Sequence, residues 1–264
     1  MDLAALTYFN DLPTLMLGVL AVFLVGLSKG GLGGAMALIA VPLLAFVMPP
    51  MQAAALLLPV LLAMDAMSLW AWRGYYDKHL LLQMLPAAVL GIVIGASAVS
   101  ITSDDFVRLL VGLVALLFVL RVAIGARGKT GGVPARRNGL LATIFGTLAG
   151  FTSFVAHAGG PPFQVYAMPL RLDPKIFTGT SVIFFAVVNA IKVIPYAALG
   201  EFTAQSLWSA LVLLPVALVS TFVGAAIVKR MRAEVFYPLM YGMVAIVACK
   251  LIYDGLSGMM TGGA

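Results

Sequence analysis

Six apolar segments, each about 20 residues or longer, constrain the fold of this chain more than any other feature. They cover residues 51–72, 80–100, 104–124, 176–199, 204–228 and 233–253. A helix needs about 20 residues to cross the ~30 Å hydrocarbon core of a bilayer. The chain is 62% hydrophobic and 10% charged, whereas a soluble globular domain is about half apolar and about a quarter charged. We therefore expect an all-α, multi-pass integral membrane protein.

Two further apolar regions are interrupted. Residues 12–48 are too many for one span, and Lys29 and several glycines break them at 28–34. Residues 138–172 are broken in the same way at HAGGPP, 157–162. Glycine weakens a helix, and a charge is costly in hydrocarbon. We predict that each region forms a broken pair of short helices, either as a re-entrant hairpin or as two short or tilted spans.

The two halves of the chain resemble each other at an offset of 124 to 130 residues. The matched positions are VPL (41–43) with MPL (168–170), Asp65 with Asn189, Pro86 with Pro215, and Gly112 with Gly242. Such self-similarity indicates an internal duplication. We predict repeat 1 over residues 1–125 and repeat 2 over 138–264, joined by a cytoplasmic linker, 126–137. Each repeat has one broken pair, 12–48 or 138–172, followed by three of the spans.

Basic residues are distributed unevenly between the loops. Twelve of them lie in or beside loops 73–79, 121–137, 171–175 and 229–232. The opposite side has only Arg108 and Lys250. Since basic residues accumulate in cytoplasmic loops, we expect both termini outside. Each repeat then crosses the membrane an odd number of times, so the two repeats have inverted topology.

Inverted repeats with broken helices are typical of transporters. Backbone that is not helical at membrane depth is tolerated only inside protein or beside a watery cavity. The second short helices begin near Ala35 and Pro161, and helix N-termini attract anions. Lys29 adds positive charge, and glycine lets a ligand approach the backbone. We predict a site for a small anion near the membrane midplane, formed by the two breaks.

The candidate substrate-binding residues lie at the breaks and on span 176–199. They are Lys29, Gly30, Gly33, Gly34, Thr152, Ser153, His157, Gly159, Gly160, Gln164, Asn189 and Lys192. Asn189 and Lys192 are three residues apart and share a helix face. Asp65 and His157 are candidates for proton coupling, and a structural ion pair between Asp65 and Lys192 is an alternative.

Other features indicate neither catalysis nor a cofactor. Gly91 with Gly95, and Gly146 with Gly150, have the spacing of close helix packing. No cluster of Cys and His suggests a metal, and the few acid and base candidates do not form a catalytic set. The net charge of +6 is explained by cytoplasmic loops, so we expect lipid and a small anion, but no nucleic acid, as partners. The sequence is compatible with a homodimer.

Three stretches resemble the sulfite exporter TauE/SafE family. They are GLSKGGLGG with VPLLA, GFTSFVAHAGGPPFQVYAMPL (150–170) and FTGTSVIFFAVVNAIKVIPYAALG (177–200), and the likeness extends over nearly the whole chain. The resemblance implies a bacterial-type inner (plasma) membrane transporter that exports sulfite or related organosulfur and sulfonate anions. Many members have a glycine triplet at each break, whereas this chain has GLGG and AGGPP. A passive anion channel of the same architecture, or a proton-coupled carrier of another small organic anion, is the alternative.

Overall fold

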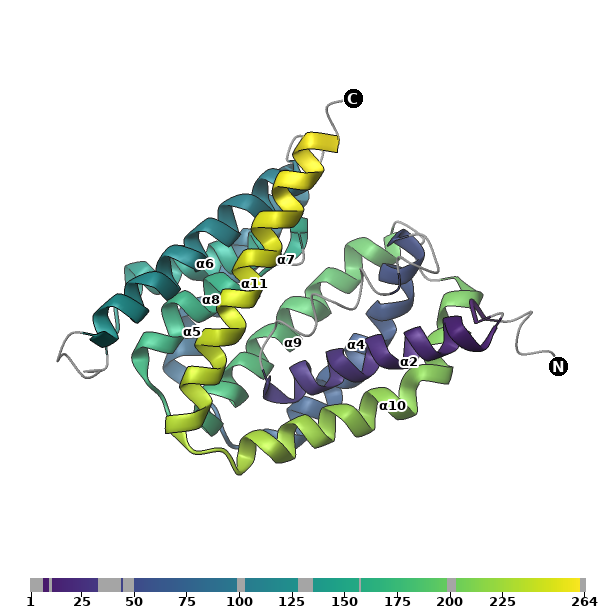
Figure 1. The fold of residues 1–264 in the computed structure, drawn as a ribbon, viewed down its shortest axis with the longest axis horizontal. Coiled ribbons are helices and arrows are strands. Elements are labelled where there is room, and N and C mark those ends of the chain that lie inside the picture. Colours follow the sequence, from purple (N-terminus) through teal and green to yellow (C-terminus); the bar gives the residue numbers. More distant parts are fainter. Residues whose placement is uncertain are drawn as a thin grey trace. The chain divides into compact units, whose positions relative to one another are not determined.

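The computed structural model describes residues 7–9, 11–32, 44, 50–98, 103–127, 135–156, 158–198 and 203–261. Within these ranges every regular element is a helix (Figure 1). The elements are α2 (Leu12–Leu27), η1 (Ser28–Leu32), α4 (Pro50–Ala71), α5 (Lys78–Ala98), α6 (Asp104–Arg127), α7 (Gly139–Ala156), α8 (Gly160–Ala167), η2 (Met168–Leu170), α9 (Pro174–Ala198), α10 (Ala204–Lys229) and α11 (Ala233–Thr261).

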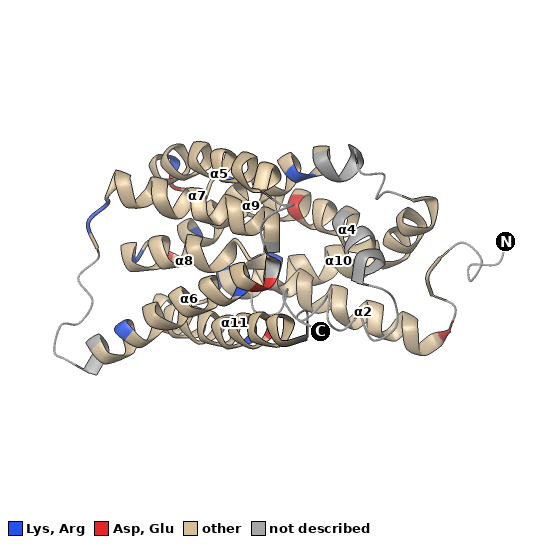
Figure 2. Ribbon diagram, turned by 90° about the horizontal axis from the view of Figure 1, so that it is seen from above, with Lys and Arg blue, Asp and Glu red and all other residues tan. Residues whose placement is uncertain are grey.

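Six helical segments of the described chain are long and apolar enough to cross a membrane. Five of them lie in α5, α6, α9, α10 and α11 and match predicted spans. The sixth joins α2 to η1, within the region predicted as a broken pair, whereas the predicted span 51–72 matches α4, of which only the shorter apolar stretch Pro59–Ala71 is found. Most of the ribbon in Figure 2 carries neither a basic nor an acidic residue. The protein is therefore an all-α, multi-pass membrane protein.

Polar residues with short side chains fix where several helices begin. The carboxylate of Asp11 accepts a hydrogen bond from the backbone N–H of Thr14 at 2.8 Å, at the start of α2. Asn138 caps α7 by accepting from the N–H of Leu141. Thr203 forms a reciprocal capping box at the start of α10. Such caps satisfy amide groups that have no partner within the helix.

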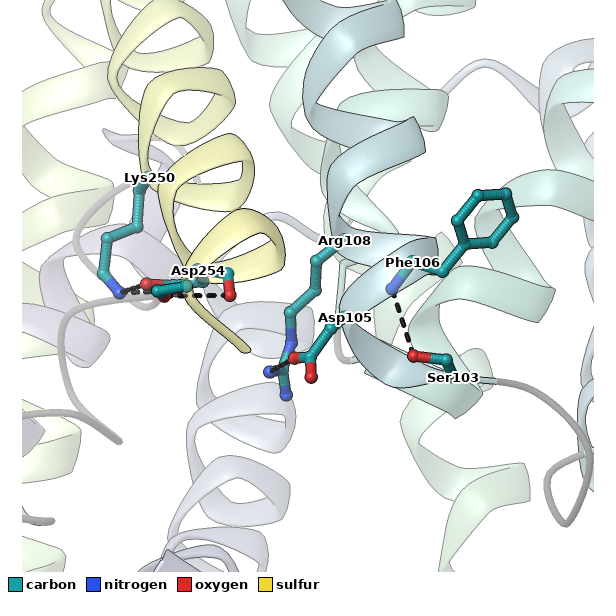
Figure 3. A network of polar contacts seen from close by, with 7 residues as sticks. Ser103, Asp105, Phe106, Arg108, Lys250 and Asp254 are labelled. Atoms are coloured by element: carbon teal, nitrogen blue, oxygen red, sulfur yellow. Dashed lines mark hydrogen bonds and ion pairs between the residues drawn. The ribbon is translucent and has the colours of Figure 1, made fainter. Parts of the chain in front are cut away.

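Helix α11 is longer than the sequence predicted, because it continues past residue 253 to Thr261. The added turns include Asp254, whose carboxylate lies 2.6 Å from the Lys250 amino group (Figure 3). Ion pairs at this spacing stabilise a helix. Arg108 and Asp105 pair in a similar way near the start of α6, at 3.1 Å.

The chain divides into two compact units that do not coincide with the predicted repeats. Unit 1 comprises Met1–Gly74 and Asn189–Met231, and unit 2 comprises Tyr75–Val188 and Arg232–Ala264. In unit 1, α10 packs against α2, α4 and η1. In unit 2, α5 packs against α7, and α6 packs against α11. Helix α9 contributes its first part to unit 2 and its last part to unit 1.

Glycines allow these helix pairs to approach closely. A Cβ atom at Gly150 would overlap the backbone of Ala88, and one at Gly91 would overlap the backbone of Thr147. Gly146 has similarly little room beside α5. The predicted packing role of these glycines is confirmed. In unit 1, a Cβ at Gly26 would overlap the side chain of Ser220, so α2 also packs closely on α10.

One polar network in unit 2 joins segments outside the spans. Arg137 donates from both guanidinium ends to the carboxylate of Asp77, with Nη1 3.0 Å from Oδ1. Asp77 also caps α5, and its backbone N–H donates to the hydroxyl of Thr180 on α9. The hydrogen bonds from Arg137 lower the pKa of Asp77. The network thus fixes the start of α5 against the segment before α7.

Candidate functional site

The first predicted break lies at η1, directly after α2. The backbone leaves helical geometry at Gly31, where φ is 128° and ψ is 1°. A residue with a Cβ atom avoids this conformation, whereas glycine adopts it at little cost. Lys29 therefore lies in a distorted turn at the end of α2, inside the interruption that the sequence predicted at 28–34.

Asp65, on α4, is the centre of a buried polar cluster in unit 1. Its Oδ1 lies 2.6 Å from the amino group of Lys29, and the side-chain amide of Asn189 donates to its Oδ2 at 2.7 Å. The side chain of Asp65 is only 7% exposed and that of Lys29 18%. Each carboxylate oxygen thus has its own donor, as buried polar groups require.

Lys192 lies on the same face of α9 as Asn189 and is 2% exposed. Among the described residues, the charged groups that act on it are Lys29 and Asp65. We refer to Lys29, Asp65, Asn189 and Lys192 as the Asp65 cluster. It holds two amino groups and one carboxylate, and η1, α4 and α9 each contribute to it.

One face of α4 also satisfies the backbone of the distorted turn. The hydroxyl of Ser68 donates to the carbonyl of Lys29 at 3.2 Å, and the indole N–H of Trp72 donates to the carbonyl of Gly30 at 3.1 Å. Carbonyl groups released by a break at membrane depth need such partners. Asp65, Ser68 and Trp72 follow each other at helical spacing, so one helix face holds the break in place.

Gly30 has a packing role in the structure. A Cβ atom at this position would overlap the carbonyl of Thr221 and meet Gly224 Cα at 2.7 Å. Glycine at position 30 is therefore explained by the close approach of η1 to α10. Its substrate-binding role stays a prediction.

The second predicted break lies in unit 2, between the end of α7 at Ala156 and the start of α8 at Gly160. Thr152 holds the two sides together. Its hydroxyl donates to the carbonyls of Leu148 and Ala158, at 2.7 and 3.1 Å, and its own carbonyl accepts from the N–H of Ala158. These bonds give Thr152 a structural role.

The residues around the start of α8 differ in their surroundings. Gly159 is packed against Ala149 and Ser153 and has no room for a side chain, whereas a Cβ atom at Gly160 would meet nothing within 4 Å. Gln164 is buried, with 8% exposed. Phe163 anchors α8 to α9 because its ring lies 4.9 Å from that of Phe184 and 5.5 Å from that of Phe185, centre to centre.

The structure brings together four of the residues that the sequence selected, namely those of the Asp65 cluster. The ion pair that it shows for Asp65 is with Lys29, whereas the sequence suggested Lys192.

The sequence interpretation missed Trp72, since a tryptophan at the end of a span is usually an interface anchor. Gly33, Gly34 and His157 lie outside the described residues. The predicted meeting of the two breaks stays a prediction.

Within the described ranges, His, Cys, Asp and Glu form no group of three or more that could hold a metal ion. The chemistry offered by the Asp65 cluster is that of amino and amide donors, which bind oxyanions through charge-assisted hydrogen bonds.

The model of the sulfite exporter TauE/SafE family matches residues 18–251, which include both breaks and the Asp65 cluster. No curated protein and no solved structure matches the chain.

Proposed function

Because this chain belongs to the sulfite exporter TauE/SafE family, we propose that it exports a small oxyanion, either sulfite or a related organosulfur or sulfonate anion. The observation that carries the proposal is the Asp65 cluster, where Lys29 and Lys192 bring two amino groups to one carboxylate. Buried amino and amide groups can donate charge-assisted hydrogen bonds to an oxyanion and so replace part of its hydration shell.

In this proposal the anion accepts hydrogen bonds from Lys192, Lys29 and Asn189. Lysine supplies a compact charge with three donors, and the Asn189 amide supplies a neutral donor. At the second break, the sequence predicts further contacts to the anion from His157 and from five neighbouring residues. They are Thr152, Ser153, Gly159, Gly160 and Gln164.

The proposed carrier consists of two inverted repeats, and the helix contacts within each unit support this. Helix α2 of repeat 1 packs on α10 of repeat 2 in unit 1. Helix α7, the counterpart of α2, packs on α5, the counterpart of α10, in unit 2. Asp65 and Asn189 occupy matched positions of the duplication and bind each other. Residues at matched positions of two repeats can contact each other when both lie beside the twofold axis that relates the repeats.

We further propose that the protein lies in a bacterial-type inner membrane, with both termini outside and the basic loops in the cytoplasm. A membrane potential that is negative inside drives an anion outward, by about 2.3 kcal/mol per charge per 100 mV. Export as uniport therefore needs no coupled ion.

The test is the flux of labelled sulfite into proteoliposomes across which a potassium gradient and valinomycin set the potential. The proposal predicts uptake that saturates with sulfite concentration, increases with an inside-positive potential, and falls at least about tenfold in Lys192→Gln. Lys250→Gln is the matched control, because Lys250 is also a lysine within a span and pairs with Asp254 of its own helix.

Three results would contradict the proposal. Flux that does not saturate and greatly exceeds carrier rates would indicate a channel. Flux that follows an imposed pH gradient without a potential would indicate proton coupling. Equal uptake by empty liposomes and proteoliposomes would exclude sulfite transport altogether.

A further inference from the structure

Trp72 contacts the first break directly beside Lys29. It follows α4 and continues the hydrogen-bond pattern of that helix, because its backbone N–H donates to the carbonyl of Ser68 at 2.8 Å. Only 1% of Trp72 is exposed. Its indole N–H donates to the carbonyl of Gly30 at 3.1 Å. The acceptor thus belongs to the residue between Lys29 and Gly31, where the backbone leaves helical geometry.

The indole ring of Trp72 is also held from a second side. The amino group of Lys229, in the last turn of α10, lies 5.4 Å from the ring centre. A cation at this distance is attracted to the face of an indole. Gly30 packs on the same helix, since a Cβ atom there would overlap the carbonyl of Thr221. Helix α10 therefore contacts both the donor and the acceptor residue of the bond from Trp72 to Gly30.

This bond affects the position of the Lys29 amino group. The two carbonyls before Gly31 accept from side chains of α4 and its end, that of Lys29 from Ser68 and that of Gly30 from Trp72. A buried carbonyl that loses its donor is costly, so the turn should shift when the indole N–H is removed. Since Lys29 precedes Gly30, such a shift also moves the amino group that pairs with Asp65.

We propose that Trp72 is a positioning residue for the anion site, because its bond to Gly30 sets where the Lys29 amino group lies. The inference rests on the proposed function, since it concerns the same site. It has a reciprocal consequence. An anion that draws the Lys29 amino group toward itself displaces the turn, and this displacement changes the bond from Trp72 to Gly30. The indole of Trp72 should therefore respond to occupancy of the Asp65 cluster.

Trp72→Phe tests the first part of the inference, because it keeps an aromatic ring beside Lys229 and removes the N–H. Trp70→Phe is the matched control. Trp70 lies on α4, is 54% exposed, and has the guanidinium of Arg73 5.2 Å from its ring centre. Calorimetric titration of the purified full-length protein with sulfite gives the dissociation constants.

We expect the dissociation constant to rise about fivefold or more in Trp72→Phe and to stay at the wild-type value in Trp70→Phe. A purely structural role of Trp72 would lower the unfolding temperature of Trp72→Phe without changing the sulfite affinity of the folded protein.

Tryptophan fluorescence tests the second part. The chain has three tryptophans, Trp70, Trp72 and Trp208. The double variant Trp70→Phe with Trp208→Phe retains Trp72, and both replaced residues are exposed. We expect sulfite to change the emission of this protein saturably, with the midpoint that calorimetry gives for the same protein. Free tryptophan titrated with sulfite controls for direct quenching.

The fluorescence titration decides the inference even where Trp72→Phe does not fold. Three results would overturn the inference and leave the proposed function standing. They are bound sulfite without a change in Trp72 emission, wild-type sulfite affinity in a folded Trp72→Phe variant, and an equal loss of affinity in Trp70→Phe. Absence of sulfite binding by wild-type protein in calorimetry would overturn both the inference and the proposed function.

Discussion

The amino group of Lys29 lies 2.6 Å from Oδ1 of Asp65 and ties the distorted turn after α2 to the middle of α4. The two residues are 36 positions apart. Both side chains are largely buried, with 18% and 7% exposed. In such a pair, removal of one partner leaves an uncompensated charge, which is more costly than loss of the pair as a whole.

Lys29→Met should therefore destabilise the protein strongly. The Asp65 carboxylate loses its 2.6 Å ion pair and keeps the hydrogen bond from Asn189 and the weaker electrostatic interaction with Lys192. We expect the free energy of unfolding to fall by about 3 kcal/mol, the cost typical of breaking a buried pair. Thermal unfolding in a fixed detergent, followed by circular dichroism, measures the change.

The double variant Lys29→Met with Asp65→Leu is the control for this prediction. It removes both charges, so it should recover much of the stability that Lys29→Met loses, while anion binding stays impaired. Additive losses in the two single variants and in the double variant would show that the two residues do not stabilise each other.

Substitution by alanine should have opposite effects on the unfolding temperature at two glycines within helices. Gly150 faces Ala88 so closely that a Cβ atom overlaps the backbone, whereas a Cβ atom at Gly242 meets nothing within 4 Å. We expect Gly150→Ala to lower the unfolding temperature by several degrees and Gly242→Ala to leave it unchanged or raise it, since alanine favours helix by about 1 kcal/mol. A smaller loss at Gly150 than at Gly242 would contradict the packing of α5 on α7.

Thr152 should contribute to stability through its hydroxyl group. Thr152→Val removes the donor to Leu148 and Ala158 in a buried setting. We expect a loss of about 1 kcal/mol in the free energy of unfolding. Thr143→Val is the matched control, because the Thr143 hydroxyl makes a similar bond to Gly139 on an exposed face of α7. An equal effect of both substitutions would contradict the role of Thr152 at the break.

The Asp77–Arg137 pair should make stability depend on pH in acid only. Arg137 lowers the pKa of Asp77 below its ordinary value of 3.8. A depressed pKa in the folded state contributes stability that is complete above about pH 4 and is lost as the pH falls through the lowered value. Arg137 is 41% exposed, so the contribution should be no more than about 1 kcal/mol.

Asp77→Asn tests this assignment. The difference in unfolding temperature between wild type and Asp77→Asn should be constant from about pH 5 to 8 and should shrink below about pH 4. A difference that persists unchanged in acid would show that the carboxylate charge of Asp77 is not the source of the effect.

Sequence alone predicted five of the helices that are long and apolar enough to cross a membrane, because length and hydropathy suffice to define such a helix. It also located the first break, since a lysine and glycines in an apolar run disrupt a helix. The duplication linked Asp65 with Asn189, and the structure joins them by a hydrogen bond. A duplication in the sequence can indicate this kind of long-range contact, because it links positions that are far apart in the chain.

Other contacts could not be predicted in this way. The pairing of Lys29 with Asp65 depends on how η1 packs on α4, and nothing in the local sequence encodes that choice. The N–H of Trp72 meets the carbonyl of Gly30 only because α4 and the break lie side by side. The extension of α11 to Thr261 was not predicted, because the apolar segment ends at residue 253, before Asp254, which pairs with Lys250 within the helix.

The central claim is that a small oxyanion binds at the Asp65 cluster, and calorimetric titration of the purified protein with sulfite tests it most directly. We predict saturable binding by wild type, and at least about tenfold weaker binding by a folded Lys192→Gln variant. Lys250→Gln should bind as wild type does. Equal sulfite affinity in wild type, Lys192→Gln and Lys250→Gln would contradict the claim.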